Sequence, residues 1–161
     1  MALHHHGAPC ALYHSALVAR TPAGMWVVEV TPVPGDGDDR GVIARGAVGY
    51  RPLGRFRIFR YEVRRWVDGA IPDLAFAVGD PVNLTTAEGR VREVLACVER
   101  VPTPVWGRDE LAAGEMWNSN SVIAWIIERS GLLGAAGRPP DGGRAPGWDA
   151  GVTVARREAG G

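Results

Sequence analysis

The sequence predicts an α+β fold in which an antiparallel sheet of four to five strands packs against two main helices. Two observations predict it. Strand-like segments bounded by turn residues fill residues 10–67, and two segments with a helical spacing of apolar residues follow within residues 85–131. A set of strands followed by a set of helices is typical of this class, because each layer must bury one apolar face against another.

The first four segments are predicted to be strands. The runs ALYHSALVAR (11–20) and MWVVEV (25–30) flank a turn at 21–24, which is a hairpin signal. Two further runs, VIARGAV (42–48) and GRFRIFRYEVRRWV (54–67), have strand-like compositions. Residues 31–41 are interpreted as a solvated turn, because their acidic residues do not follow the EF-hand pattern.

Two helices are predicted next. Thr85 and Glu88 have the spacing of a capping box, and a stripe of apolar residues ending near Pro102 follows them. The second helix lies in EMWNSNSVIAWIIERSGL (115–132), and Gly131 stands where a C-terminal glycine cap is expected.

The chain is predicted to hold one domain at 10–133, between a disordered tail (1–9) and a C-terminal extension (134–161). The tail contains three consecutive histidines, which are native, a weak metal site or an expression remnant. The extension has eight glycines and three prolines, so we expect it to lack long regular structure, with Trp148 pinning it to the body as an extended strap.

Composition points to a soluble, cytoplasmic protein. Of the 161 residues, 46% are apolar, and 18 basic residues balance 18 acidic ones, so no net charge favours nucleic acid or an anionic surface. No apolar run approaches the roughly 20 residues of a membrane span. Cys10 and Cys97 do not form a disulfide framework, and we expect both to be small buried hydrophobes.

Arginines and aromatic residues alternate within residues 55–66. Arg55, Arg57, Arg60, Arg64 and Arg65 beside aromatic side chains could bind a phosphate backbone or stacked bases. The alternative is an exposed strand whose charges protect it from edge pairing. The balanced net charge and the lack of a nucleic-acid motif favour this alternative.

Four polar residues, Asn118 to Ser121, precede the apolar part of the second helix, although one is enough to cap a helix. Ser119 would lie among free backbone N–H groups at the positive end of the helix dipole, which stabilise an oxyanion. The only histidine outside the N-terminal tail is His14, so we expect it to be the base for this serine. The alternatives are an ordinary N-cap and a core histidine.

Glu29 is the predicted third member of this site. If the hairpin turn is symmetric about residues 22 and 23, strand partners sum to 45, and Glu29 becomes the diagonal neighbour of His14 on one sheet face. A carboxylate inside the apolar run WVVEV would then orient the imidazole. Otherwise Glu29 is an exposed residue of a half-buried strand.

The order of a histidine strand, further strands and a polar motif opening the last helix resembles the circularly permuted papain-like fold of the NlpC and lecithin:retinol acyltransferase type. There the nucleophilic cysteine starts a helix in an Asn-Cys-x-His-Phe motif. In NSNSVI, Ser119 takes the place of that cysteine, and His14 and Glu29 match the other two positions. The strings WNSNSVIAWI and HSALVARTPAGMWVVEV look closer still to an uncharacterised bacterial family with a Pro-Asn-Ser-Asn-Thr-Phe motif. The resemblance covers residues 10–130.

The resemblance implies a hydrolase or acyltransferase acting on an amide, ester or thioester through Ser119, His14 and Glu29. It equally allows a catalytically inactive module that holds a small-molecule, peptide or acyl ligand in the same cleft, because serine replaces the cysteine. Asn118 and Asn120 are expected to hold the helix entry or a substrate carbonyl, and Ser121 is expected to be the cap. These three residues and Trp117 are the candidate substrate-binding residues. A third possibility is an anion or nucleic-acid binder that uses the arginines within residues 55–65. The sequence contains no cofactor motif and no recognised spacing of metal ligands.

Overall fold

A computed structural model describes residues 14–32, 40–67, 81–136 and 144–160. Within these ranges the chain forms four strands, two short 3-10 helices and four α-helices. In chain order, they are β1 (Leu17–Thr21), β2 (Gly24–Pro32), β3 (Val42–Ala47), η1 (Arg51–Arg55), η2 (Arg57–Phe59), β4 (Arg60–Val67), α1 (Glu88–Val98), α2 (Ser119–Arg129), α3 (Leu133–Ala136) and α4 (Trp148–Ala159). The predicted tail at 1–9, Cys10 and most of the acidic turn lie outside the described residues.

The four strands form one antiparallel sheet in the order β1-β2-β4-β3, which confirms the predicted α+β class. The β1–β2 hairpin has the predicted register: Leu17 pairs with Val28 and Thr21 with Gly24, so partner numbers sum to 45. Pairing begins at Leu17, and His14 therefore lies before the strand rather than inside it.

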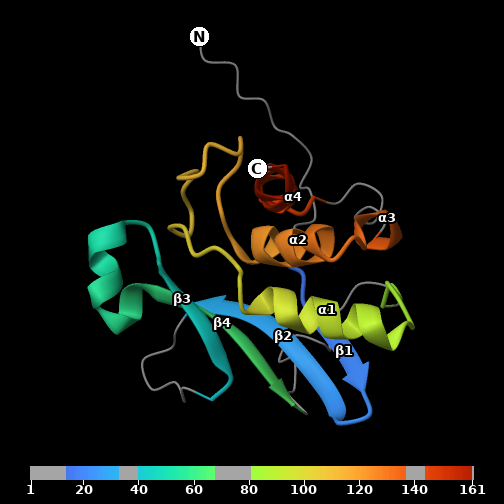
Figure 1. The fold of residues 1–161 in the computed structure, drawn as a ribbon. Coiled ribbons are helices and arrows are strands. Elements are labelled where there is room, and N and C mark those ends of the chain that lie inside the picture. Colours follow the sequence, from blue (N-terminus) through green and yellow to red (C-terminus); the bar gives the residue numbers. More distant parts are fainter. Residues whose placement is uncertain (1–13, 33–39, 68–80, 137–143, 161) are drawn as a thin grey trace.

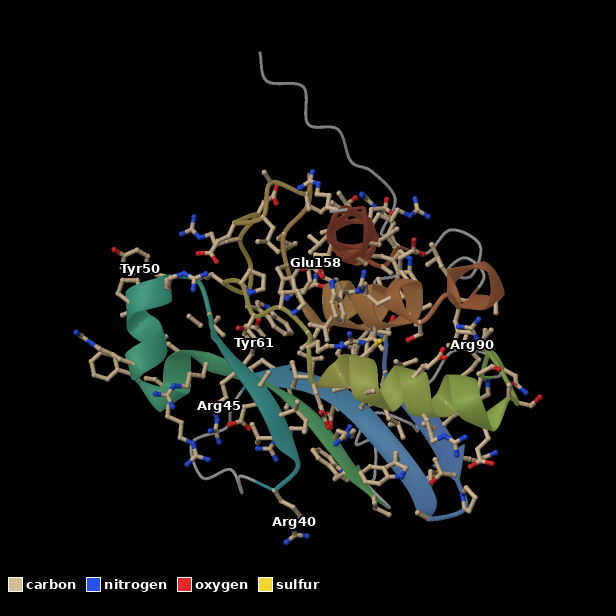
Figure 2. The ribbon with its side chains drawn as sticks, viewed as in Figure 1. Arg40, Arg45, Tyr50, Tyr61, Arg90 and Glu158 are labelled. Atoms are coloured by element: carbon tan, nitrogen blue, oxygen red, sulfur yellow. The ribbon has the colours of Figure 1, made fainter. Side chains whose placement is uncertain are left out.

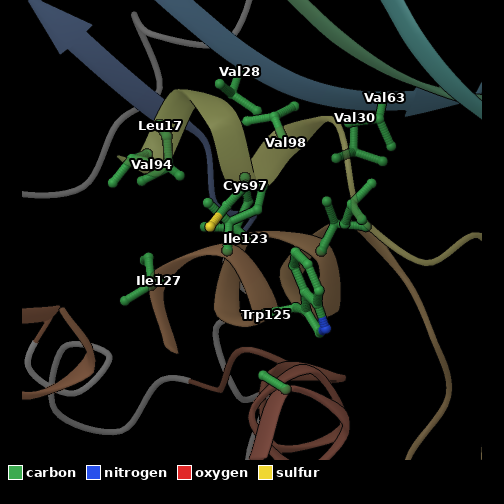
Figure 3. Packing of buried hydrophobic residues seen from close by; sticks show 14 of the residues in the cluster. Leu17, Val28, Val30, Val63, Val94, Cys97, Val98, Ile123, Trp125 and Ile127 are labelled. Carbon is green, nitrogen blue, oxygen red and sulfur yellow. The ribbon is translucent and has the colours of Figure 1, made fainter. Parts of the chain in front are cut away.

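Two helices cover one face of the sheet, and a third lies beyond them (Figure 1). Helix α1 crosses the sheet, α2 lies beside α1, and α4 packs on the far side of α2. The core between the sheet and α2 includes Val28, Cys97, Val98 and Ile123 (Figure 3). Cys97 is a buried free thiol, as predicted.

The C-terminal extension contains a 12-residue helix, α4, so the expectation of an irregular strap was wrong. The glycines that suggested irregularity serve the packing of this helix. A Cβ on Gly151 would lie 2.1 Å from the backbone oxygen of Ser121, so only glycine allows α4 to approach the first turn of α2 this closely. Trp125 of α2 donates from Nε1 to Glu158 of α4, at 3.0 Å.

The fourth strand starts at Arg60, and the predicted strand residues 54–59 belong instead to the end of η1, to η2 and to Phe56 between them. Backbone hydrogen bonds three residues apart, from Leu53 to Tyr50 and from Phe56 to Leu53, turn the chain out of the sheet. The chain returns where Val48 donates to the Phe59 carbonyl, at 2.8 Å. Pro in the first turn of η1 favours this departure from the strand, because its fixed φ suits a helix start.

The helix ends were predicted with mixed success. Gly131 follows α2 with a φ of 67°, and Leu132 donates to Ile127, as expected for a glycine cap. At α1 the predicted capping box is wrong, because the N-cap is Ala87 and makes no side-chain hydrogen bond. Thr85 instead lies two residues before that N-cap and accepts a hydrogen bond from the Ala87 N–H at 3.1 Å.

Candidate active site

The first turn of α2 is built around Asn118. Its extended backbone, with φ −156° and ψ −166°, makes it the N-cap, and its side-chain oxygen accepts from the Ser121 N–H at 3.2 Å. In return, the Ser121 hydroxyl accepts from the Asn118 N–H at 3.1 Å. This reciprocal pair is a capping box. The predicted cap, Ser121, is therefore the third helical residue and supports the true cap, Asn118.

Ser119, the first residue of α2, contacts His14. The Ser119 Oγ lies 2.7 Å from His14 Nδ1, across 105 residues of sequence. Ser119 is only 5% exposed, whereas His14 is exposed, so the pair is reached from the histidine side. The structure thus brings together the serine and histidine that the sequence singled out, at hydrogen-bonding distance.

Asn120 fixes the position of the histidine-bearing segment. Its side-chain oxygen accepts from the Ser15 N–H at 2.9 Å, and its side-chain nitrogen donates to the Pro146 carbonyl at 3.1 Å. Asn120 is buried. Ser15 directly follows His14, and Asn120 directly follows Ser119. The hydrogen bond between Asn120 and Ser15 therefore joins the neighbours of Ser119 and His14.

The segment before α4 completes this end of α2. Pro146 accepts a second hydrogen bond from the Asn118 side chain at 2.8 Å, and the Gly147 N–H donates to Glu115 at 2.8 Å. Gly147 has a φ of 83°, and a Cβ there would lie 2.6 Å from both Asn118 Oδ1 and Ser121 Oγ. Sequence reasoning missed this contact, because WDAGVTVA largely alternates apolar with polar or small residues, which is typical of a strand and gives no clear helical signal.

Glu29 does not join the pair on the α2 side of the sheet. Its neighbours Val28 and Val30 point into the core beneath α2, so alternation along β2 directs Glu29 to the opposite face. There it lies opposite Arg64 of β4. The predicted orienting role assumed that β1 continued to His14, but the chain leaves the sheet at Leu17, and the imidazole reaches α2 instead.

The four residues expected to contact substrate have structural contacts. Asn118, Asn120 and Ser121 form the network described above. Trp117 is 2% exposed and pairs through its backbone with Arg108 and Gly107. It lies near Tyr61, whose pKa is raised because burial disfavours the phenolate. Asn118 and Asn120 hold the helix entry, which was one of their two predicted roles. The substrate-binding role of the four residues stays a prediction.

A cavity of about 370 Å³ opens at the same end of α2, lined by Glu115, Met116, Arg144, Pro146 and Gly147. It shares Pro146 with the Asn118 and Asn120 network, while Ser119 and His14 are not part of its lining. Within the described ranges, no group of three or more His, Cys, Asp or Glu residues could hold a metal ion.

Three of the arginines considered for nucleic-acid binding make contacts inside the protein. Arg64 binds the buried Glu62, and Arg65 donates to the Leu95 carbonyl at 2.7 Å and to Glu99 at 2.9 Å. Arg60 donates to the carbonyls of residues 54 and 55. These contacts favour a structural role for β4. Arg55 and Arg57 are exposed.

Comparisons with known proteins identify no relative: no protein-family model matches the chain, and neither curated proteins nor solved structures gave a significant match. Among the described residues, no helix has the length and hydrophobicity needed to cross a bilayer.

Proposed function

We propose that this protein is a hydrolase or acyltransferase with a permuted papain-like fold, acting on an amide, ester or thioester through Ser119 and His14. The observation that carries the proposal is the 2.7 Å contact between the Ser119 hydroxyl and the His14 ring at the N-terminus of α2. Nucleophile and base must come within this distance for proton transfer during attack.

The proposed reaction has two halves. With its own proton on Nε2, His14 accepts the Ser119 proton at Nδ1 while Oγ attacks the substrate carbonyl carbon. His14 then gives that proton to the leaving amine, alcohol or thiol as the bond to the carbonyl breaks, which leaves an acyl group on Ser119. Water or another acceptor then loses its proton to His14 and attacks the acyl carbon, and His14 returns that proton to Ser119 Oγ as the acyl–Oγ bond breaks.

The first turn of α2 would stabilise the negative charge of the intermediate. The N–H group of Ser119 is the first in α2 and has no acceptor within the helix. It lies at the positive end of the helix dipole, and Ser119 is largely shielded from water. Glu29 has no part in this mechanism, because it faces the other side of the sheet.

Labelling with a fluorophosphonate probe, read by intact mass and peptide mapping, tests the proposal. We expect one adduct on Ser119, lost in Ser119→Ala and at least about a hundredfold slower in His14→Gln, because general-base catalysis contributes roughly that much. Ser130→Ala is the matched control: the hydroxyl of this buried serine at the other end of α2 donates to the Ile126 carbonyl, far from His14 in the sequence and from the first turn of α2. An adduct that persists in Ser119→Ala would contradict the proposal.

The second candidate function is a binding module without turnover. The 5% exposure of Ser119 favours it, because a nucleophile must meet its substrate directly. In that case the folded protein would remain unlabelled by acyl and phosphonyl probes, while a peptide or acyl ligand would still raise its melting temperature.

A further inference from the structure

The segment that joins β3 to β4 leaves the body of the protein. We call residues 50–59 the β3–β4 projection; it extends sideways from the sheet, away from the helices (Figure 1), with Tyr50 on its outer side (Figure 2). Neither η1 nor η2 contains a buried residue. Tyr50 is 60% exposed, Phe56 48% and Ile58 68%. Three bulky apolar side chains thus face solvent within nine residues, a grouping that marks interaction sites.

The projection is ordered by contacts at its base. Val48 and Phe59 close it through a backbone hydrogen bond of 2.8 Å, and Arg60 donates to the carbonyls of Gly54 and Arg55. Gly54 packs so closely on Ala47 that an added Cβ would lie 2.8 Å from the alanine Cβ. The apolar side chains are therefore held outward by the fold, and ordering them on contact with a partner would cost little entropy.

The charge of the projection differs from that of the whole chain. Residues 50–59 carry three arginines and no acidic residue, although the chain has a net charge of zero. Arg51 binds Glu110 at the side of the body, and Arg55 and Arg57 are exposed beside the apolar tip. Arg55 lies over the Phe56 ring, 4.6 Å from its centroid, so cation and apolar surface are presented together.

We propose that the β3–β4 projection docks the protein on an anionic lipid bilayer. Phe56 and Ile58 would enter the region between headgroups and acyl chains, and Arg55 and Arg57 would contact the lipid phosphates. A convex tip whose most exposed apolar residue is aliphatic fits a bilayer, since stacking of nucleic-acid bases uses aromatic or guanidinium planes. The charge of the tip complements that of the anionic lipid headgroups.

Flotation of the full chain with vesicles tests this docking. We expect binding to vesicles of phosphatidylcholine mixed with phosphatidylglycerol, weaker binding as salt rises, and no binding to phosphatidylcholine alone. Arg55→Gln with Arg57→Gln should weaken binding by about 25-fold, about fivefold per arginine. Phe56→Ser with Ile58→Ser should weaken it at least about tenfold.

Two double variants outside the projection are matched controls. Val18→Ser with Val82→Ser removes two other exposed apolar residues, and Arg92→Gln with Arg156→Gln removes the same charge from helix surfaces. Both should bind like the wild type. Because the changed side chains lie at the surface, all variants should remain folded, with only small shifts in melting temperature. The proposal is overturned if wild type does not float with anionic vesicles, if the projection variants bind equally well, or if the projection binds single-stranded nucleic acid and no vesicle.

Discussion

Helices α1 and α2 pack beside one another but begin in opposite ways. The start of α1 is exposed, its N-cap Ala87 makes no side-chain hydrogen bond, and its first turn is supported by a surface pair between Glu88 and Arg92. The start of α2 is buried and carries four consecutive polar residues, all hydrogen-bonded. A helix needs only one cap, so the additional groups at α2 serve another purpose: they position Ser119, His14 and α4.

Replacement of a single glycine near each helix start should give the largest contrast. Gly151 of α4 packs on the first turn of α2, and Gly89 lies in the first turn of α1. Gly151→Ala places a Cβ 2.1 Å from the Ser121 carbonyl oxygen, so α4 must move away from the first turn of α2. We expect a loss of about 3 kcal/mol in the free energy of unfolding, measured by urea denaturation. Gly89→Ala in α1 meets open space and should stabilise the protein by about 0.5–1 kcal/mol. Equal signs for the two variants would refute the assigned packing.

Removal of the first polar group at each helix start should give the next largest effect. Asn118→Ala leaves the Ser121 N–H without its acceptor and removes one of the two hydrogen bonds to the Pro146 carbonyl, and we expect a loss of about 2 kcal/mol. Thr85→Ala removes one exposed hydrogen bond to Ala87, and a loss below about 0.5 kcal/mol should follow. If Asn118→Ala and Thr85→Ala lower the free energy of unfolding by comparable amounts, in both thermal and urea denaturation, the two helix starts are equivalent.

Replacement of Asn120 distinguishes an effect on stability from an effect on the position of His14 relative to Ser119. Asn120→Ala loses the contacts to Ser15 and Pro146, which we expect to cost about 1–2 kcal/mol and to slow fluorophosphonate labelling of Ser119 at least about tenfold. Ser130→Ala loses one buried hydrogen bond and should cost about 1 kcal/mol without changing the labelling rate. If both variants slow labelling in proportion to their stability loss, Asn120 has only a structural role.

The same comparison explains how much the sequence could predict. Ser119 and His14 were found because a helix start with surplus polar residues and a single internal histidine are local features. The hairpin register followed from its two-residue turn. Glu29 was misplaced because alternation holds only inside a strand, and pairing stops at Leu17.

The elements that the sequence did not predict depend on contacts between distant segments. The glycines at 147 and 151 lower helix propensity locally, but they lie where α4 meets α2. Residues 54–59 have the composition of a strand, yet closure of the chain between Val48 and Phe59 excludes them from the sheet. Such tertiary contacts outweigh propensity and cannot be read from one segment alone.

A thiol at each helix start should have the smallest effect on stability and tests the chemistry of the site directly. Ser119→Cys changes one atom, and we expect it to cost at most about 1 kcal/mol. A helix start and an adjacent imidazole both favour a thiolate, so the pKa of this cysteine should fall well below the free value of about 8.5. Glu88→Cys places the same residue first in exposed α1 without a histidine, and its pKa should stay closer to the free value. The pH profile of iodoacetamide alkylation, with adducts located by peptide mapping, measures both pKa values.

His14→Gln in the Ser119→Cys background is the control. It should shift the alkylation profile back toward that of Glu88→Cys, because the remaining stabilisation of the thiolate is that of a helix start alone. If the alkylation profiles of Ser119→Cys and Glu88→Cys superimpose, the polar groups of α2 do not activate a nucleophile. The binding module would then be the better account of the site.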